Sequence, residues 1–186
     1  LHSRWIILVW FILINYITVH LSYSLWESVM AVHMTNMGIP FYAYSMLWTL
    51  NGVLIIIGQP LVNKLSPYVR LSTQIIVGIF IFALSFLLLI FARTLTAFVI
   101  DFVILTIGEM TSFAGLPAWI AQLTNVNEAG HYQGLLNIMM SVGRAIGPLY
   151  GGFVIEKGSY QFLFISVFCL MTSTLIIICL YLWHLH

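Results

Sequence analysis

Six long apolar stretches constrain the fold of this 186-residue chain more than any other feature of its sequence. They run over about 5–34, 42–65, 68–91, 96–121, 131–155 and 161–182. A helix that crosses a bilayer needs about 20 mostly apolar residues, and each stretch is long enough. A helix also satisfies its own backbone polar groups in lipid. We therefore expect an all-α membrane protein, a bundle of six transmembrane helices.

The scarcity of charge supports the same interpretation. Only 6% of the residues are charged, whereas a soluble domain carries about 25%. The net charge of +1 provides no basic patch for nucleic acid. Cys169 and Cys179 lie ten residues apart, about 15 Å along a helix, which is too far for a disulfide. No metal-site spacing is present, so we expect neither a metal nor a cofactor.

Short segments rich in Gly, Pro, Asn and Ser separate the six stretches, as turns require. Consecutive helices are therefore expected to be antiparallel neighbours, with both termini on one side. That side would hold Arg4, Lys64 and Arg70, against Arg93 and Lys157 on the other. This bias favours a multi-pass protein of the cell membrane with both termini in the cytoplasm.

Four charged residues lie away from the ends of the predicted helices. Asp101 is about one turn inside the fourth helix and could reach the interface. Glu27 is about 22 residues into the long first helix, which places it towards the far surface. Glu109 and Arg144 lie near the centres of the fourth and fifth helices, at a similar depth.

The depth of Glu109 and Arg144 allows two interpretations. A charge at the middle of the bilayer costs at least about 2.5–3.5 kcal/mol, so such residues face a wet cavity or pair with one another. In the first interpretation, Glu109 takes up and releases a proton as the cavity opens to each side. In the second, a Glu109–Arg144 pair fixes the packing of the two helices. Both hold if proton uptake breaks the pair.

Helix breakers gather in the stretch SVGRAIGPLYGG, residues 141–152. At about 100° per residue, Gly143, Gly147 and Gly151 fall on one face, a pattern that lets two helices approach closely. Pro148 removes one backbone hydrogen bond and bends the helix, and Arg144 projects from the edge of the glycine face. The stretch is either a helix–helix contact or a seam about which helices rock.

Polar side chains mark the first two helices as possible walls of a cavity. Two stripes follow the first helix: Asn15, Thr18, Ser22 and Trp26, and then Tyr16, His20, Tyr23 and Glu27. A helix that faced only lipid would not keep these groups. Asn51 in the second helix either lines the cavity or bonds a neighbouring helix. The absence of G-x-S-x-G, H-E-x-x-H and clustered acidic motifs gives no support for an enzyme.

Three segments resemble a known family. GRAIGPLYGG, Gly143–Gly152, is similar to the G-x-x-x-G-P-x-x-G-G signature of proton-coupled exporters in the major facilitator superfamily. Residues Ile107–Asn125, followed by GHYQGL at Gly130–Leu135, resemble a helix–loop–helix of bacterial drug-efflux-type permeases. Leu47–Leu65 resembles their eighth helix. The resemblance covers most of the chain and says little about the substrate.

The resemblance implies half of a twelve-helix fold. The family's G-x-L-A-D-R-x-G-R loop is missing after the second helix, where the chain reads GQPLVNKLSPYVR. We therefore expect residues 1–186 to be the C-terminal six-helix domain, paired with an N-terminal half. The resemblance makes the first and fourth helices line a cavity, flanked by the second and fifth. The candidate cavity residues are Asn15, Ser22, Trp26, Glu27, Asn51 and Glu109.

The function expected from these observations is secondary active transport by alternating access. The most specific function that we expect is proton-coupled export of a small amphipathic or drug-like compound by an antiporter. Glu109 would be the carboxylate that takes up and releases the proton. The gating residues would be Gly143, Arg144, Gly147, Pro148 and Gly151. The alternatives are an uptake permease for a sugar or other metabolite, and a membrane scaffold without a transport cycle.

Overall fold

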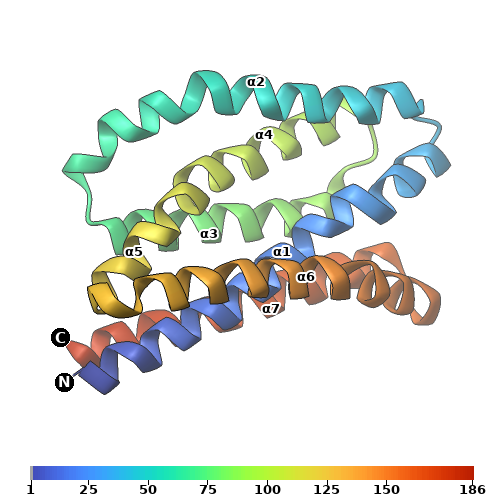
Figure 1. The fold of residues 1–186 in the computed structure, drawn as a ribbon. Coiled ribbons are helices and arrows are strands. Elements are labelled where there is room, and N and C mark those ends of the chain that lie inside the picture. The colour runs from blue at the N-terminus through green and yellow to red at the C-terminus, as the bar shows by residue number, and fades with distance from the viewer. Residues whose placement is uncertain (1) are drawn as a thin grey trace.

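The computed structural model describes residues 2–186 as an all-helical bundle with six helical spans and no strand in that range (Figure 1). The predicted fold class, six apolar helices in an all-α protein, is confirmed. The α-helices are α1 His2–Asn36, α2 Phe41–Leu65, α3 Leu71–Leu88, α4 Leu95–Ser112, α5 Leu116–Leu123, α6 Ala129–Lys157 and α7 Tyr160–Leu185. Both ends of the chain lie at the same end of the bundle.

The fourth span is broken, although its sequence was expected to form one continuous helix over about 96–121. The helix α4 ends at Ser112, a 3₁₀ turn covers Phe113–Gly115, and α5 begins at Leu116. Pro117 explains the break, because it has no backbone N–H to bond the carbonyl four residues before it. The hydroxyl of Ser112 also bonds the Gly108 carbonyl, 2.7 Å away, which competes with regular helix bonding.

Two glutamines support α4 just before this break. The side-chain amide of Gln59 on α2 donates to the Met110 carbonyl at 3.3 Å. The amide of Gln74 on α3 donates to the Thr111 carbonyl at 3.1 Å. Carbonyl groups near an irregular segment in lipid need such partners, because no water is available to them.

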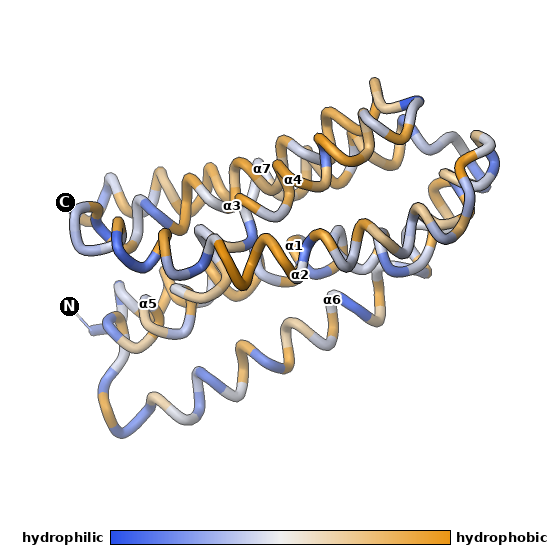
Figure 2. The backbone as a smooth tube through the Cα atoms, turned by 90° about the horizontal axis from the view of Figure 1, so that it is seen from above, coloured by the Kyte–Doolittle hydropathy of each residue, from blue (hydrophilic) through white to orange (hydrophobic). Residues whose placement is uncertain are grey.

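The helices are arranged around α1, α3 and α4. The helix α1 packs along α6 and α7, α3 packs along α4 and α7, and α2 contacts chiefly α4. Figure 1 shows α2 along one edge of the bundle, with α6 and α7 along the opposite edge. Figure 2 shows hydrophobic residues along most of α3, α4 and α7, and a more mixed composition along α6. As a result, α2 and α6 are the least buried of the long helices.

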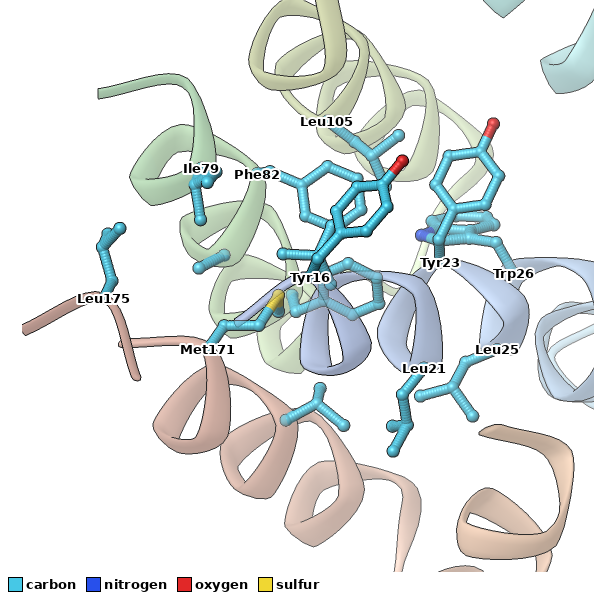
Figure 3. Close-up of a cluster of buried hydrophobic side chains, with 14 of the residues drawn as sticks. Tyr16, Leu21, Tyr23, Leu25, Trp26, Ile79, Phe82, Leu105, Met171 and Leu175 are labelled. Atoms are coloured by element: carbon cyan, nitrogen blue, oxygen red, sulfur yellow. The ribbon is translucent and has the colours of Figure 1, made fainter. Parts of the chain in front are cut away.

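The helix α1 sends side chains to opposite sides of the core. Tyr16 and Tyr23 extend towards α4 and Phe82 of α3, whereas Leu21 and Leu25 extend the other way (Figure 3). All five side chains are buried. The helix α1 is therefore buried between neighbours on both of these sides.

The glycine face of α6 packs directly on α1. A Cβ atom placed on Gly143 would lie 2.6 Å from the Ile17 carbonyl oxygen and 2.9 Å from the Leu21 nitrogen. A Cβ on Gly147 would lie 2.6 Å from the Leu21 carbonyl oxygen. Only glycine permits such an approach of two backbones. The helix α6 continues through Pro148, and the side chain of Pro148 is exposed.

A second glycine contact joins α3 and α4, and it was not predicted. A Cβ on Gly108 would lie 2.5 Å from the Phe82 nitrogen and 2.7 Å from the Gly78 carbonyl oxygen. This contact fixes the rotation of α4. The next residue, Glu109, is turned about 100° from Gly108 and so points away from α3.

Candidate functional site: a carboxylate held by three helices

Glu109 is a partly buried carboxylate on α4 that accepts hydrogen bonds from two other helices. The hydroxyl of Tyr23, on α1, donates to Oε1 at 3.3 Å. The side-chain amide of Asn51, on α2, donates to Oε2 at 3.0 Å. Each carboxylate oxygen therefore has its own donor, and α1, α2 and α4 meet at this side chain.

Asn51 also connects to the interior of α4. Its Nδ2 donates to the Thr106 hydroxyl at 2.9 Å, and that hydroxyl donates to the Phe102 carbonyl at 2.7 Å. One amide nitrogen carries two hydrogens, so it can serve Thr106 and Glu109 together. Because Asn51 is buried, its orientation is set by these bonds. The sequence left open whether Asn51 lines a cavity or bonds a neighbouring helix, and here it bonds α4.

Arg144 contacts Glu27 rather than Glu109. Its Nη2 atom lies 3.8 Å from Glu27 Oε1, and the two side chains are 46% and 43% exposed. The Glu109–Arg144 pair, one of the two interpretations that the sequence left open, is not formed within residues 2–186. The glycine contact holds α6 against α1, so Arg144 reaches a carboxylate of α1. Tyr23 and Asn51 already occupy both oxygens of Glu109.

Aromatic rings pack around Tyr23, one of the two hydrogen-bond donors to Glu109. The Tyr23 ring is nearly parallel to Phe82 at 6.0 Å between centroids, and its centroid lies 5.8 Å from that of Trp48. His20 lies between Tyr16 and Phe113, at 4.4 and 5.3 Å. Both of its ring nitrogens are buried without a hydrogen-bond partner in residues 2–186. The sequence placed Tyr23 and His20 on a polar stripe but singled out neither as a site residue.

Three other predicted cavity residues point into the protein. The Asn15 amide donates to the Thr174 hydroxyl at 2.8 Å and so ties α1 to α7. The Ser22 hydroxyl donates to the Thr18 carbonyl of its own helix at 2.8 Å. Trp26 is fully buried against Phe102, 4.6 Å between ring centroids. Within residues 2–186, none of the three side chains bonds Glu109 or Arg144.

Asp101 is buried within the bundle, although its position in the sequence suggested that it could reach the membrane interface. Its side chain is buried, and neither carboxyl oxygen has a hydrogen-bond partner within the described residues. Asp101 itself lines a cavity of about 220 Å³, together with Leu88, Phe91, Ala92, Ala97, Ile100 and Ile104.

Comparison with known proteins agrees with this architecture. A family model described as Major Facilitator Superfamily matches residues 8–185. The uncharacterized MFS-type transporter YttB of Bacillus subtilis (strain 168) is 36% identical over 169 residues, which cover 90% of this chain and 43% of YttB. The vacuolar basic amino acid transporter 1 of Saccharomyces cerevisiae (strain ATCC 204508 / S288c) is 34% identical over 106 residues, which cover 57% of this chain and 19% of the yeast protein.

The chain thus spans less than half of the length of these two relatives. The family model, by contrast, extends over nearly all of it, from within α1 to the end of α7. The six apolar helices make it a multi-pass membrane protein. With this match along its length, the chain belongs to the major facilitator superfamily.

Proposed function

We propose that the chain is part of a secondary active transporter that exports a small amphipathic compound in exchange for protons. The observation that carries the proposal is the position of Glu109, whose two oxygens accept hydrogen bonds from α1 and α2. The family of transporters to which the chain belongs, and its two transporter relatives, support the general class.

Protonation of Glu109 changes which hydrogen bonds its carboxyl group can form with Tyr23 and Asn51. An ionised carboxylate only accepts hydrogen bonds, whereas the protonated form carries one O–H donor. One of the two contacts, from Tyr23 or from Asn51, must then weaken or reverse. Because these bonds connect α4 with α1 and α2, proton uptake loosens three helices at one point. That is the local change a proton-driven switch requires.

The chain accounts for one half of the proposed cavity. It spans 43% of the length of YttB, and α2 and α6 leave large apolar side chains exposed, including Ile56 and Leu149 at 76% each. We assign the second wall to an N-terminal six-helix half of the same protein. The glycine contact between α1 and α6 then lies within this half, near the interface at which the two halves rock against each other. Both termini of the chain face the cytoplasm in this arrangement, and the host is the cell membrane.

The test is Glu109→Gln in the full-length gene product, reconstituted in proteoliposomes with a pH-sensitive dye inside. A broad panel of amphipathic compounds is screened for substrate-dependent proton flux. We expect the variant to lose this flux, because Gln cannot take up a proton. It should keep substrate exchange in the absence of a pH gradient, because its amide resembles the neutral carboxylic acid. Unchanged proton flux and an unchanged pH profile would remove Glu109 from the mechanism.

Glu156→Gln is the matched control. Glu156 is an exposed carboxylate near the C-terminal end of α6, away from the hydrogen bonds around Glu109. The control variant should transport as the parent protein does. If both variants lose activity together, the loss reports general damage to the protein and not proton coupling.

A metabolite uptake permease is the second candidate, favoured by the yeast relative whose name concerns basic amino acids. Substrate and proton then move in the same direction rather than in opposite directions. Measuring the sign of the pH change when substrate is added to one side separates the two. A protein that shows no substrate-dependent flux for any compound on the panel would be a scaffold without a transport cycle.

A further inference from the structure

We infer that Arg144 and Glu27 together recognise a zwitterion, a small molecule that carries a carboxylate and an ammonium group on neighbouring atoms, as an α-amino acid does. The inference rests on the transport function proposed above and names its substrate class. It starts from the hydrogen-bonding state of these two side chains, which differs from that of Glu109.

Arg144 is a charged side chain whose donors are unused. A guanidinium carries five N–H donors, yet Arg144 makes no hydrogen bond within residues 2–186. Its contact with Glu27 measures 3.8 Å, which is longer than a hydrogen bond. It also lies near the middle of the span Val126–Lys157, where an uncompensated charge is unfavourable. The N–H groups of Arg144 can therefore donate to an anionic group of a ligand.

Glu27 is the complementary half of the site. It is 43% exposed and accepts no hydrogen bond among the described residues, in contrast to Glu109, whose oxygens are both occupied. The distance between the two charges is set by backbone packing. Gly143, next to Arg144, lies against the backbone of α1, and Glu27 belongs to that helix. The pair thus offers opposite charges at a fixed spacing.

Charge balance selects a zwitterion over a simple cation or anion. The pair is neutral, and a bound zwitterion keeps it neutral, with the ligand carboxylate on Arg144 and the ligand ammonium on Glu27. A lone cation would take Glu27 and leave Arg144 without a partner, and a lone anion would do the reverse. A charge left without a partner near the middle of the bilayer is unfavourable. A guanidinium also binds a carboxylate through two parallel hydrogen bonds, which fixes the ligand orientation.

Aromatic side chains beside the pair suit the rest of such a ligand. Tyr23 is one helical turn before Glu27 on α1, so the two side chains lie on the same face. The Trp48 ring is 5.8 Å from Tyr23. These rings favour an apolar or aromatic ligand side chain, which makes the expected ligand amphipathic as well as zwitterionic.

The experiment measures equilibrium binding to the purified full-length gene product in detergent, by tryptophan fluorescence and by calorimetry. The probes are the twenty common L-amino acids. The tightest binder is then compared with its methyl ester, which is a cation, and its N-acetyl derivative, which is an anion. We expect both capped forms to bind about tenfold to a hundredfold more weakly, the effect of losing one charge-assisted hydrogen bond. Capped forms that bind as well as the parent, or no amino acid that binds, would overturn the inference.

Charge-removing variants separate recognition from structural support. Glu27→Gln should lose affinity for the amino acid but prefer the N-acetyl derivative, because Arg144 is then free for an anion. Arg144→Gln should prefer the methyl ester for the converse reason. A purely structural pair would lower affinity for all three probes alike, and that result would refute the site.

The outcomes of these measurements distinguish a failure of the zwitterion site from a failure of the transport proposal. A zwitterion that binds without any proton-coupled flux would end the transport proposal and leave the binding site intact. Proton-coupled flux of compounds that lack one of the two charges would end the zwitterion site and leave the transport proposal intact.

Discussion

The glycine contact between α6 and α1 makes a quantitative prediction about stability. In Gly143→Ala, the new Cβ would lie 2.6 Å from the Ile17 carbonyl oxygen and 2.9 Å from the Leu21 nitrogen. Favourable contacts of carbon lie at about 3.5–4.0 Å, so the methyl group is roughly 0.9 Å too close to the oxygen. Both obstacles are backbone atoms, which no rotamer change can move. The two helices must separate, and overpacking of this kind costs about 1–3 kcal/mol.

Gly152→Ala is the matched control. It lies in the same helix, and a Cβ there meets nothing within 4 Å. Both variants gain the same helix propensity of about 1 kcal/mol when Gly becomes Ala, so that gain cancels in the comparison. We therefore expect Gly143→Ala to be less stable than Gly152→Ala by about 1–3 kcal/mol.

The assay is reversible unfolding in mixed micelles, followed by circular dichroism as the fraction of denaturing detergent rises. Both variants are compared with the parent protein under one set of conditions. Equal stability of the two variants, within about 0.5 kcal/mol, would refute the close backbone contact between α1 and α6.

Three further predictions use the same unfolding assay. Gly108→Ala should destabilise by about 1–3 kcal/mol, because its Cβ would lie 2.5 Å from the Phe82 nitrogen; a neutral result argues against the α3–α4 contact. Asn15→Ala and Thr174→Val should show a coupling of about 0.6–1.7 kcal/mol in a double-mutant cycle, and additive effects would mean that their hydrogen bond is absent. Asp101→Leu should stabilise by about 1–3 kcal/mol, because it removes a buried carboxyl without partners; a loss of stability would indicate that the carboxyl has a partner.

Periodicity and depth could be predicted from the sequence, because both follow from counting along one helix. Gly143 and Gly147 recur at a helical spacing, and both lie in the contact with α1. Glu109 and Arg144 stand near the middle of their spans, and this is also visible in the sequence. Spacing alone therefore identified these residues as exceptional within apolar helices.

The partners of these residues could not be predicted, because partners depend on which helices pack together. Arg144 meets Glu27 because α6 lies against α1, a relation between segments far apart in the sequence. Asn15 looked like a cavity residue, but its side-chain amide bonds Thr174 of α7. Gly108 stands alone in its helix, so no spacing drew attention to its contact with α3.

The break in the fourth span was visible only in part. Pro117 and Gly115 are recognisable helix breakers, but the apolar stretch continues across them, and apolar length dominated the prediction. The side-chain donors from Gln59 and Gln74 are contributed by other helices. Their positions could not be inferred before the packing was known.

The break gives the fourth span a joint whose backbone carbonyls are satisfied from the side. A regular helix that bends in lipid must sever its own internal bonds, and the freed groups find no water. At Met110 and Thr111, amide groups of α2 and α3 already bond the carbonyls from outside. The segment Leu116–Leu123 can therefore tilt relative to Leu95–Ser112 while the donors at the joint stay in place. Such a joint allows α5 to move together with the loop that follows it, while α4, which carries Glu109, keeps its position against α1 and α2.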